Sequence, residues 1–305
     1  MFPEGGKVLS GVNPGELLRQ LGKAAEVRLN EPLAPHTTFG VGGEAAYYVV
    51  PHHPTAVRDI VGLCRDASIP YMLLGAGSNV LFSDNGYAGV IISTEQLTGI
   101  RIDGFHADVY AGTRIGDLLT RLHRAGIHSL DFLSGIPGTI GGAIAMNAGI
   151  PETAVGEQVK HVWALDADGN ISCLDGRVCR FSYRDSVFRE QRLPILAVRL
   201  YLGGPVYDSC QLIARRKKNQ PVGVRSAGCV FKNPPGDAAG RLIEAVGLKG
   251  FRVGMAKVSE KHANFIINLG GASSADIRKL IDIVRQKVYK SFRILLELEI
   301  EVIDG

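Results

Sequence analysis

The sequence predicts an α+β protein, in which helices and strands alternate with glycine-rich loops. Segments with helical spacing of apolar residues, such as Thr55–Ala67 and Ser274–Phe292, share the chain with short apolar runs typical of strands. The triplet Gly203-Gly204-Pro205 separates a strand-rich N-terminal part from a C-terminal part with a different pattern. A chain of 305 residues is long enough for two or three domains, each with its own core.

The N-terminal part is predicted to hold most of the strands. We assign helices where apolar residues recur every three or four positions, and strands where short apolar runs end at turn residues. In chain order these are a helix over 14–22, a strand over 45–50, a helix over 55–67, strands over 71–74, 89–93 and 107–111, a helix over 115–125, and strands over 158–166, 171–174 and 195–202. The turn Asp168-Gly169-Asn170 predicts a hairpin between two of these strands.

The C-terminal part is predicted to be richer in helix. In order, it contains a helix over 208–218, an irregular segment over 220–236, a helix over 238–246 and a strand over 263–269. Ser274–Phe292 is the clearest helix of the chain, with Ser273 and Asp276 as its capping pair. Leu296–Val302 alternates apolar residues with three glutamates, which predicts a strand with its carboxylates on one face.

Composition and charge exclude several classes of protein. Hydrophobic residues at 46% and charged residues at 21% are typical of a globular protein, and the net charge of +4 is too small to indicate nucleic-acid binding. No apolar run reaches the length of a membrane span, and Met1–Gly11 has no secretory pattern. The five scattered cysteines favour a reduced, cytoplasmic setting, and no His or Cys spacing predicts a metal site.

Two loops of small residues carry the strongest functional signal. The run Ser134–Gly149 is almost entirely small or aliphatic, so we expect it to fill a core poorly and its glycines to weaken both helix and strand. A second such loop, Gly75-Ala-Gly-Ser-Asn79, follows the apolar strand at 71–74, and Ala111-Gly-Thr113 lies between the two. Bare backbone amides in two loops predict a ligand with phosphates and a flat ring, which is a dinucleotide.

The string Gly40-Val-Gly-Gly-Glu-Ala45 matches the dinucleotide fingerprint of the Rossmann fold in its letters only. That fingerprint needs a strand before it and a helix after it. Here Tyr47–Val50 is strand-like, so the Rossmann interpretation fails.

Four motifs in family order resemble the UDP-N-acetylenolpyruvoylglucosamine reductase (UDP-N-acetylmuramate dehydrogenase) family, over about residues 30–305. They are Leu74–Leu81, Ser134–Gly142 with Asn147, Tyr183-Arg-Asp-Ser186, and Gly228-Cys-Val-Phe-Lys-Asn-Pro234. The short stretch between residues 186 and 220 is similar to the family's second structural type. The resemblance implies two α+β subdomains, 1–87 and 88–204, that form an FAD-binding unit of the vanillyl-alcohol-oxidase/p-cresol-methylhydroxylase type. A C-terminal α+β substrate domain, 205–305, would follow.

The resemblance also implies the cofactors and the residues around them. FAD would be bound non-covalently, with NADPH as reductant, because the family uses both. The implied FAD-binding residues are Gly75, Ala76, Gly77, Ser78, Asn79, Val80, Gly112, Ser134, Gly135, Ile136, Pro137, Gly138, Thr139, Gly142 and Asn147. Small-residue amides suit the pyrophosphate and the negative charge of a reduced flavin.

The implied reaction reduces UDP-N-acetylglucosamine enolpyruvate to UDP-N-acetylmuramate for peptidoglycan precursors. Without the resemblance, Arg184 is a surface cation beside Asp185, Cys229 a small buried residue, and Glu299 one of three solvated carboxylates. With it, Arg184 and Glu299 stabilise the enolate, and Cys229 replaces the family's usual serine as proton donor. A thiol, with a pKa of about 8.5, is a much stronger acid than an alcohol. The implied substrate-binding residues are Tyr183, Lys217, Lys218 and Asn233. The protein is expected to be a monomer.

Two alternatives stay open at this stage. The cofactor loops also fit a flavin-dependent alcohol oxidase of the related superfamily. The basic run Arg215-Arg-Lys-Lys218 would fit a nucleotide- or RNA-binding module, although the small net charge argues against it.

Overall fold

The computed structural model describes residues 14–23 and 25–304 of the chain. They form two compact units, each assembled from separate stretches of sequence. The first unit contains the residues up to Asn30, Ala46–Ala76 and Ala88–Ala214; the second contains Glu31–Ala45, Gly77–Tyr87 and the residues from Arg215 onward. The predicted domain boundaries at residues 87 and 204 stay predictions.

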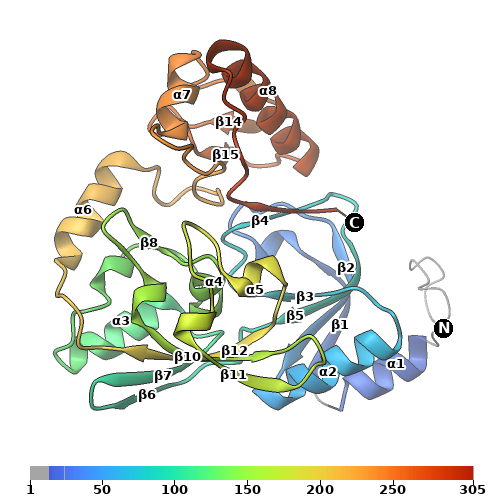
Figure 1. Ribbon diagram of the computed structural model, residues 1–305. Coiled ribbons are helices and arrows are strands. Elements are labelled where there is room, and N and C mark those ends of the chain that lie inside the picture. Colours follow the sequence, from blue (N-terminus) through green and yellow to red (C-terminus); the bar gives the residue numbers. More distant parts are fainter. Residues whose placement is uncertain (1–13, 24, 305) are drawn as a thin grey trace. The chain divides into compact units, whose positions relative to one another are not determined.

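One layer of the first unit is a four-stranded sheet covered by two helices. Its strand order is β1-β2-β5-β3, from Ala25–Pro32, Glu44–Pro51, Tyr87–Ser93 and Tyr71–Leu74. Helices α1 (Pro14–Leu21) and α2 (Pro54–Asp66) lie side by side (Figure 1). Their apolar faces pack on the sheet because Leu21 and Ile60 share a core with Val49 and Ile92. Strand β2 begins at Glu44, inside the Gly40–Ala45 string, so no helix follows the glycines and the Rossmann context is missing.

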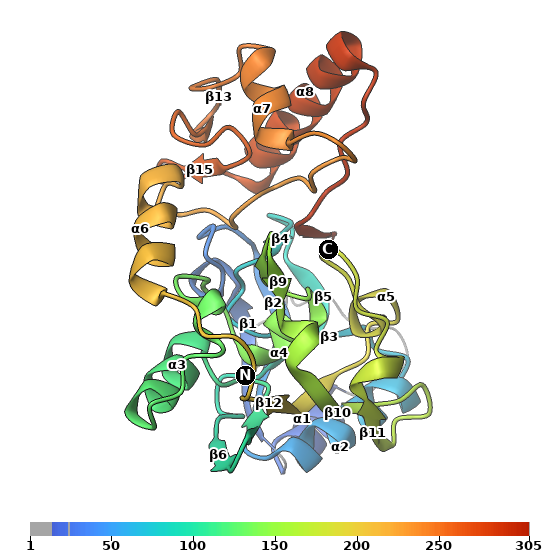
Figure 2. The same ribbon diagram turned by 60° about the vertical axis from the view of Figure 1, so that its left-hand side comes forward.

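The second layer is an antiparallel five-stranded sheet in the order β11-β10-β12-β7-β6. The strands are Ile171–Asp175, Val159–Leu165, Ile195–Tyr201, His106–Tyr110 and Ile100–Asp103. The predicted hairpin is confirmed, because β10 pairs with β11 antiparallel. Helices α3 (Ile115–Arg124) and α4 (Ile140–Ala145) lie beside this sheet (Figure 2) and bury Leu118, Leu122 and Ile144 in its core. The short elements β8, β9 and α5 are Gly149–Ile150, Thr153–Ala154 and Val187–Glu190.

The second unit has a helical core with small sheets. Its elements are β4 (Val80–Phe82), α7 (Ala239–Ala245), β13 (Arg252–Val253), β14 (Ala256–Val258), β15 (Ile266–Asn268), α8 (Ser274–Phe292) and β16 (Glu301–Ile303). Helix α6 (Ser209–Asn219) begins in the first unit and ends in the second. The predicted capping pair of α8 is confirmed, because Ser273 Oγ accepts from the amide of Asp276 and the Asp276 side chain accepts from the amide of Ser273.

The glycine-rich run departs from the prediction, because it contains helix α4 and contributes to the core. Ile140, Ala143 and Ile144 are buried. Thr139 caps the helix by accepting from the amide of Gly142 at 3.4 Å. Gly141 lets the helix approach its neighbour closely, because a Cβ there would lie 2.9 Å from the Cβ of Ala111. The space is therefore filled because the backbone of α4 lies close to its neighbour, and no large side chains are needed.

The C-terminal strand is shorter than predicted. Only Glu301–Ile303 form β16, which pairs parallel with β4. The preceding residues keep the predicted alternation, with Leu296 and Ile300 buried and Glu297 exposed, but they form only an isolated bridge from Leu298 to Phe231. Their partner segment is irregular, so no continuous ladder forms. The strand predicted at 263–269 is likewise limited to β15.

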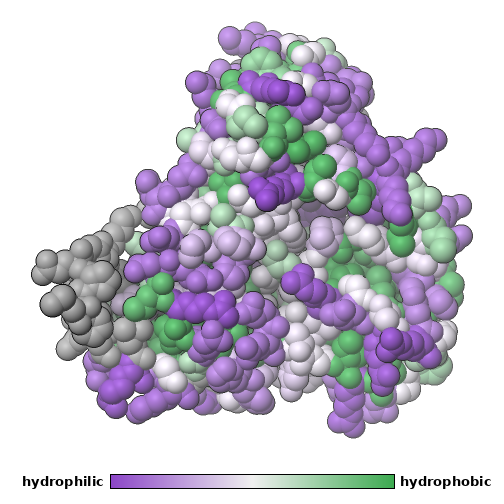
Figure 3. Space-filling view, turned by 180° about the vertical axis from the view of Figure 1, so that it is seen from behind, coloured by the Kyte–Doolittle hydropathy of each residue, from purple (hydrophilic) through white to green (hydrophobic). Residues whose placement is uncertain are grey.

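On the face drawn in Figure 3, hydrophilic residues surround small groups of hydrophobic ones. No helix among residues 14–23 and 25–304 combines the length and the apolar character that crossing a membrane requires.

Candidate active site

The loop after β3 presents backbone amides that the protein itself does not use. In the described residues, the N–H groups of Gly75, Ala76, Gly77 and Ser78 donate no hydrogen bond. The left-handed φ of +60° at Gly77 favours glycine, and a Cβ there would lie 2.0 Å from the carbonyl oxygen of His36. A row of free amides without bulky side chains fits the anionic pyrophosphate of a dinucleotide.

The two predicted cofactor loops meet inside the first unit. A Cβ on Gly75 would lie only 2.5 Å from Oγ1 of Thr139, so the backbone at Gly75 lies directly against the cap of α4. Gly75 and Thr139 are 64 positions apart in the sequence, so no local sequence pattern could predict that they lie close together. The contact supports a shared role of the two loops, because one ligand can reach both.

A methyl group at position 75 tests this contact. We expect Gly75→Ala to cost about 1–3 kcal/mol, since the added methyl group would clash with the buried Thr139 side chain, and to lower FAD retention. Removing the hydroxyl as well, in Gly75→Ala/Thr139→Ala, should restore part of both, although Thr139→Ala alone loses a cap worth about 1 kcal/mol. Thermal melts and the flavin absorbance of purified protein measure these effects.

Gly62→Ala is the matched control for that substitution. Gly62 lies within α2, and a Cβ there would meet no atom within 4 Å. Alanine at this helix position should keep or raise stability. Equal behaviour of Gly75→Ala and Gly62→Ala would contradict the close approach of the two loops.

The loop from Ser134 to Thr139 also leaves amides available. Ser134 and Ile136 donate to the carbonyl groups of Asp131 and Leu133, at 2.9 and 3.0 Å. The amides of Gly135, Gly138 and Thr139 donate no hydrogen bond within the described part of the chain, and Pro137 has none to give. These amides belong to the loop that is predicted to lie along a flavin.

Other predicted cofactor residues are occupied by the protein's own hydrogen bonds. The amide of Gly112 donates to Leu97 O at 2.9 Å, and that of Gly142 points to Thr139. Val80 is the first residue of β4 and pairs with Glu301. Asn79 Nδ2 donates to the carbonyl oxygen of Glu299 at 3.1 Å, which links the first cofactor loop to a candidate catalytic segment.

Arg184 lies on a tight turn that is anchored to the end of α4. Ser182 and Asp185 exchange two backbone hydrogen bonds across the turn, and Arg184 adopts a left-handed φ of +56°. Asn147, itself left-handed and buried, donates its side-chain amide to Ser182 O at 2.8 Å. Ser186 Oγ donates to Ala145 O at 2.7 Å. The side chain of Asn147 therefore holds the arginine turn, a role that the sequence did not indicate.

The side chains of Tyr183 and Arg184 stand next to each other on this turn. The guanidinium carbon of Arg184 lies 5.6 Å from the centre of the Tyr183 ring, within the range of a cation–π contact. Tyr183 is 54% exposed, so its ring is available to a ligand. Both residues belong to the first unit.

Cys229 and Glu299 occupy neighbouring segments of the second unit. The amide of Glu299 donates to Val230 O at 2.8 Å, so its backbone lies beside the residue that follows Cys229. Cys229 forms an isolated bridge with Phe265 and is half-buried. The structure thus brings together two candidate catalytic residues that are 70 positions apart in the sequence.

Asn264 fixes the segment that carries Cys229. Its buried side chain accepts from the amide of Phe231 at 3.0 Å and donates to Phe231 O at 2.8 Å, and its carbonyl oxygen accepts from Val230. His262 has a structural role, because its Nδ1 accepts from the amide of Asn264. Burial lowers the pKa of His262, which keeps the ring neutral.

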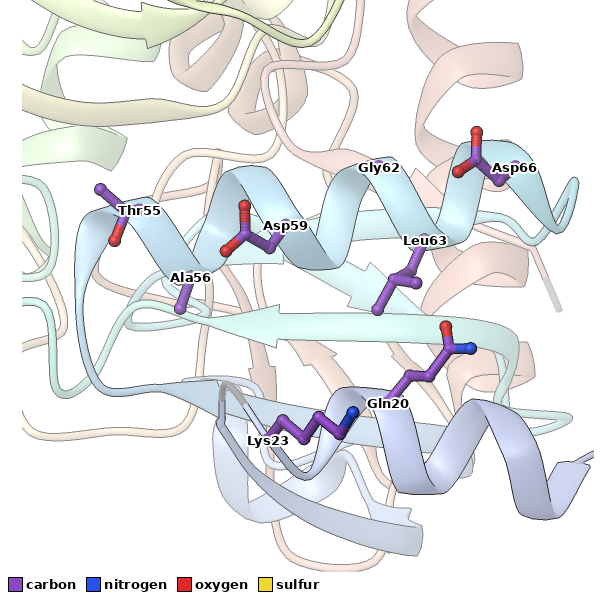
Figure 4. Close-up of a pocket in the computed structure, with 8 residues that line it drawn as sticks. All are labelled: Gln20, Lys23, Thr55, Ala56, Asp59, Gly62, Leu63 and Asp66. Carbon is purple, nitrogen blue, oxygen red and sulfur yellow. The ribbon is translucent and has the colours of Figure 1, made fainter.

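The other predicted substrate residues lie at exposed or structural positions of the second unit. Lys217 and Lys218 are exposed in the last turn of α6, and the carbonyl oxygen of Lys217 accepts from Lys261 Nζ. The side chain of Asn233 accepts from the amide of Ala239 at 3.0 Å and so supports the start of α7. A groove of about 610 Å³ between α1 and α2, lined by residues such as Lys23, Asp59 and Asp66 (Figure 4), contains none of the predicted site residues.

Comparison with known proteins identifies the family. The model of the UDP-N-acetylenolpyruvoylglucosamine reductase C-terminal domain matches residues 220–303, and that of an FAD binding domain matches residues 45–174. A UDP-N-acetylenolpyruvoylglucosamine reductase from Caldicellulosiruptor bescii is 41% identical over 281 residues, 90% of either chain. The chain belongs to the UDP-N-acetylenolpyruvoylglucosamine reductase family.

Two further members of the family agree with this. The reductase of Moorella thermoacetica is 43% identical over 296 residues, 94% of this chain and 96% of its own. The crystal structure of the Thermus caldophilus enzyme matches with a TM-score of 0.76 at 35% identity, over 91% of this chain and 98% of its own. The α+β fold with an FAD-binding part and the reductase C-terminal domain is therefore confirmed.

Proposed function

We propose that this chain catalyses the FAD-dependent reduction of UDP-N-acetylenolpyruvoylglucosamine to UDP-N-acetylmuramate with NADPH, a step of peptidoglycan precursor synthesis. The observation that carries the proposal is the match to reductases over nine-tenths of the chain, joined to two amide-rich loops that meet at Gly75 and Thr139. The substrate is a small nucleotide sugar. We further propose a cytoplasmic monomer.

The free amides divide into two groups with different tasks. Those of Gly75, Ala76, Gly77 and Ser78 would hold the FAD pyrophosphate, because they are unused and unshielded by side chains. Those of Gly135, Gly138 and Thr139 would line the ring system. When bound, FAD supplies the hydride that the enolpyruvyl group accepts. No covalent attachment is expected, since neither loop contains His or Cys.

The remaining chemistry falls to side chains of this chain. Hydride addition leaves negative charge on the substrate, conjugated with its carboxylate, and the Arg184 guanidinium would stabilise it through charge-assisted hydrogen bonds. Cys229 would donate its Sγ proton to the carbanion carbon, and Glu299 would position that end of the substrate. Tyr183, Lys217 or Lys218, and Asn233 would contact the nucleotide sugar and its phosphates.

The visible spectrum of the purified protein tests the function directly. We expect a yellow protein whose flavin absorbance fades on anaerobic addition of NADPH and returns on addition of the enolpyruvyl nucleotide. A colourless protein that cannot be loaded with FAD would refute the proposal. A yellow protein that oxidises alcohols with rapid oxygen uptake, and leaves the enolpyruvyl nucleotide unchanged, would refute the reductase assignment in favour of an oxidase.

A further inference from the structure

Two histidines and a buried aspartate form a compact cluster at the end of α3. His123 Nε2 lies 2.5 Å from one carboxylate oxygen of Asp131, and His128 Nδ1 lies 3.0 Å from the other. The two imidazole rings stack with their centres 4.9 Å apart. All three potential ligand atoms lie within 4.8 Å of one another. The cluster lies wholly in the first unit and contains none of the residues assigned to the reaction.

Burial distinguishes this cluster from an ordinary surface ion pair. The Asp131 side chain is 1% exposed, whereas those of His123 and His128 are 36% and 44% exposed. A buried carboxylate needs compensating partners, and here both come from imidazole nitrogens. The carboxylate therefore lies at the buried base of the cluster, and the two imidazole rings lie where solutes can reach them.

We propose that His123, His128 and Asp131 bind a divalent transition-metal ion, with Zn²⁺ as the preferred member of the class. Two imidazoles and one carboxylate are a ligand set that zinc and its neighbours use in proteins. Imidazole disfavours the hard cations Mg²⁺ and Ca²⁺, which prefer oxygen ligands. The site could not be predicted from the sequence, because the spacing of positions 123, 128 and 131 matches no familiar metal motif.

Metal binding requires only small changes in the cluster. In the neutral form each histidine can donate the N–H that faces Asp131; a metal ion takes the place of those two protons, which move to the other ring nitrogens as the tautomers change. In a tetrahedral zinc site with bonds of about 2.0–2.1 Å, ligand atoms are about 3.3 Å apart. Each nitrogen must therefore withdraw from its carboxylate oxygen by less than 1 Å, and the most distant pair of ligand atoms, within 4.8 Å of each other, must close by up to about 1.5 Å. Water would complete the coordination from the exposed side.

Calorimetric titration of the full-length, FAD-loaded protein with ZnCl₂, after removal of metals with EDTA, tests the proposal. We expect saturation at one Zn²⁺ per chain, and at least a tenfold loss of affinity in both His123→Gln and His128→Gln. MgCl₂ should give no binding heat. Zn²⁺ should raise the melting temperature of the wild-type protein and not that of His128→Gln.

His161→Gln serves as the matched control, because His161 lies on β10 against Trp163 and outside the cluster. It should bind Zn²⁺ like the wild type. The absence of saturable binding in the wild type would overturn the proposal. So would unchanged affinity in His128→Gln, because the metal would then be held elsewhere, for example by the exposed thiols of Cys173 and Cys210. Melting curves without metal establish that each variant is folded.

Discussion

Replacing Cys229 with alanine is expected to lower turnover of the enolpyruvyl nucleotide by about 10²–10⁴-fold, the usual contribution of a positioned proton donor. The reduction of bound FAD by NADPH should keep its wild-type rate, because that half-reaction needs no proton from this thiol. Stopped-flow absorbance measures the two half-reactions separately. The neighbouring backbone is held by the Asn264 side chain, which this substitution leaves in place.

Two further variants sharpen the Cys229 experiment. Cys229→Ser should retain far more activity than Cys229→Ala, since a hydroxyl at this position also has a transferable proton. Cys173→Ala removes an exposed thiol on β11 and should change neither half-reaction. If Cys229→Ala slowed both half-reactions equally, Cys229 would not be the proton donor.

Local sequence signals predicted all the helices of seven residues or more and most of the long strands, but not β1, β4, β6, β13 or β14. The apolar spacing and the capping pair of α8, and the turn at Asp168–Asn170, depend on contacts between close neighbours in the chain, and the structure confirms both. Helix α4 was missed because its stability comes from packing against Ala111 and from the Thr139 cap, and glycine content alone indicates neither. The C-terminal strand was overextended because strand length depends on the partner segment.

The candidate site shows the same division between local and distant contacts. Free amides could be predicted, because a run of small residues leaves backbone exposed. The contact of Gly75 with Thr139, and the anchoring of Ser182 by Asn147, join residues that are distant in the sequence, so no local pattern reveals them. The His123, His128 and Asp131 cluster is similar, because its residues meet only when the chain turns after α3.

The second large effect is expected at Arg184. Removing its guanidinium should lower turnover by roughly 10²-fold, equivalent to about 3 kcal/mol of lost stabilisation of developing negative charge. Arg184→Asn is the preferred variant, because asparagine tolerates the left-handed φ of +56° that this position requires. The turn should then persist, and melting temperature and FAD content should stay near wild type. Steady-state kinetics with the enolpyruvyl nucleotide give the loss in kcat.

Arg192→Asn is the matched control, since Arg192 also has a left-handed φ, +52°, but lies outside the Tyr183–Ser186 turn. It repeats the same change of charge and backbone preference and should leave kcat unchanged. Arg184→Lys should fall between wild type and Arg184→Asn, because lysine keeps the charge and loses the planar donor fork. A catalytic role therefore requires the order wild type, lysine, asparagine in kcat at constant stability. An equal loss in Arg192→Asn would instead attribute the effect to overall charge.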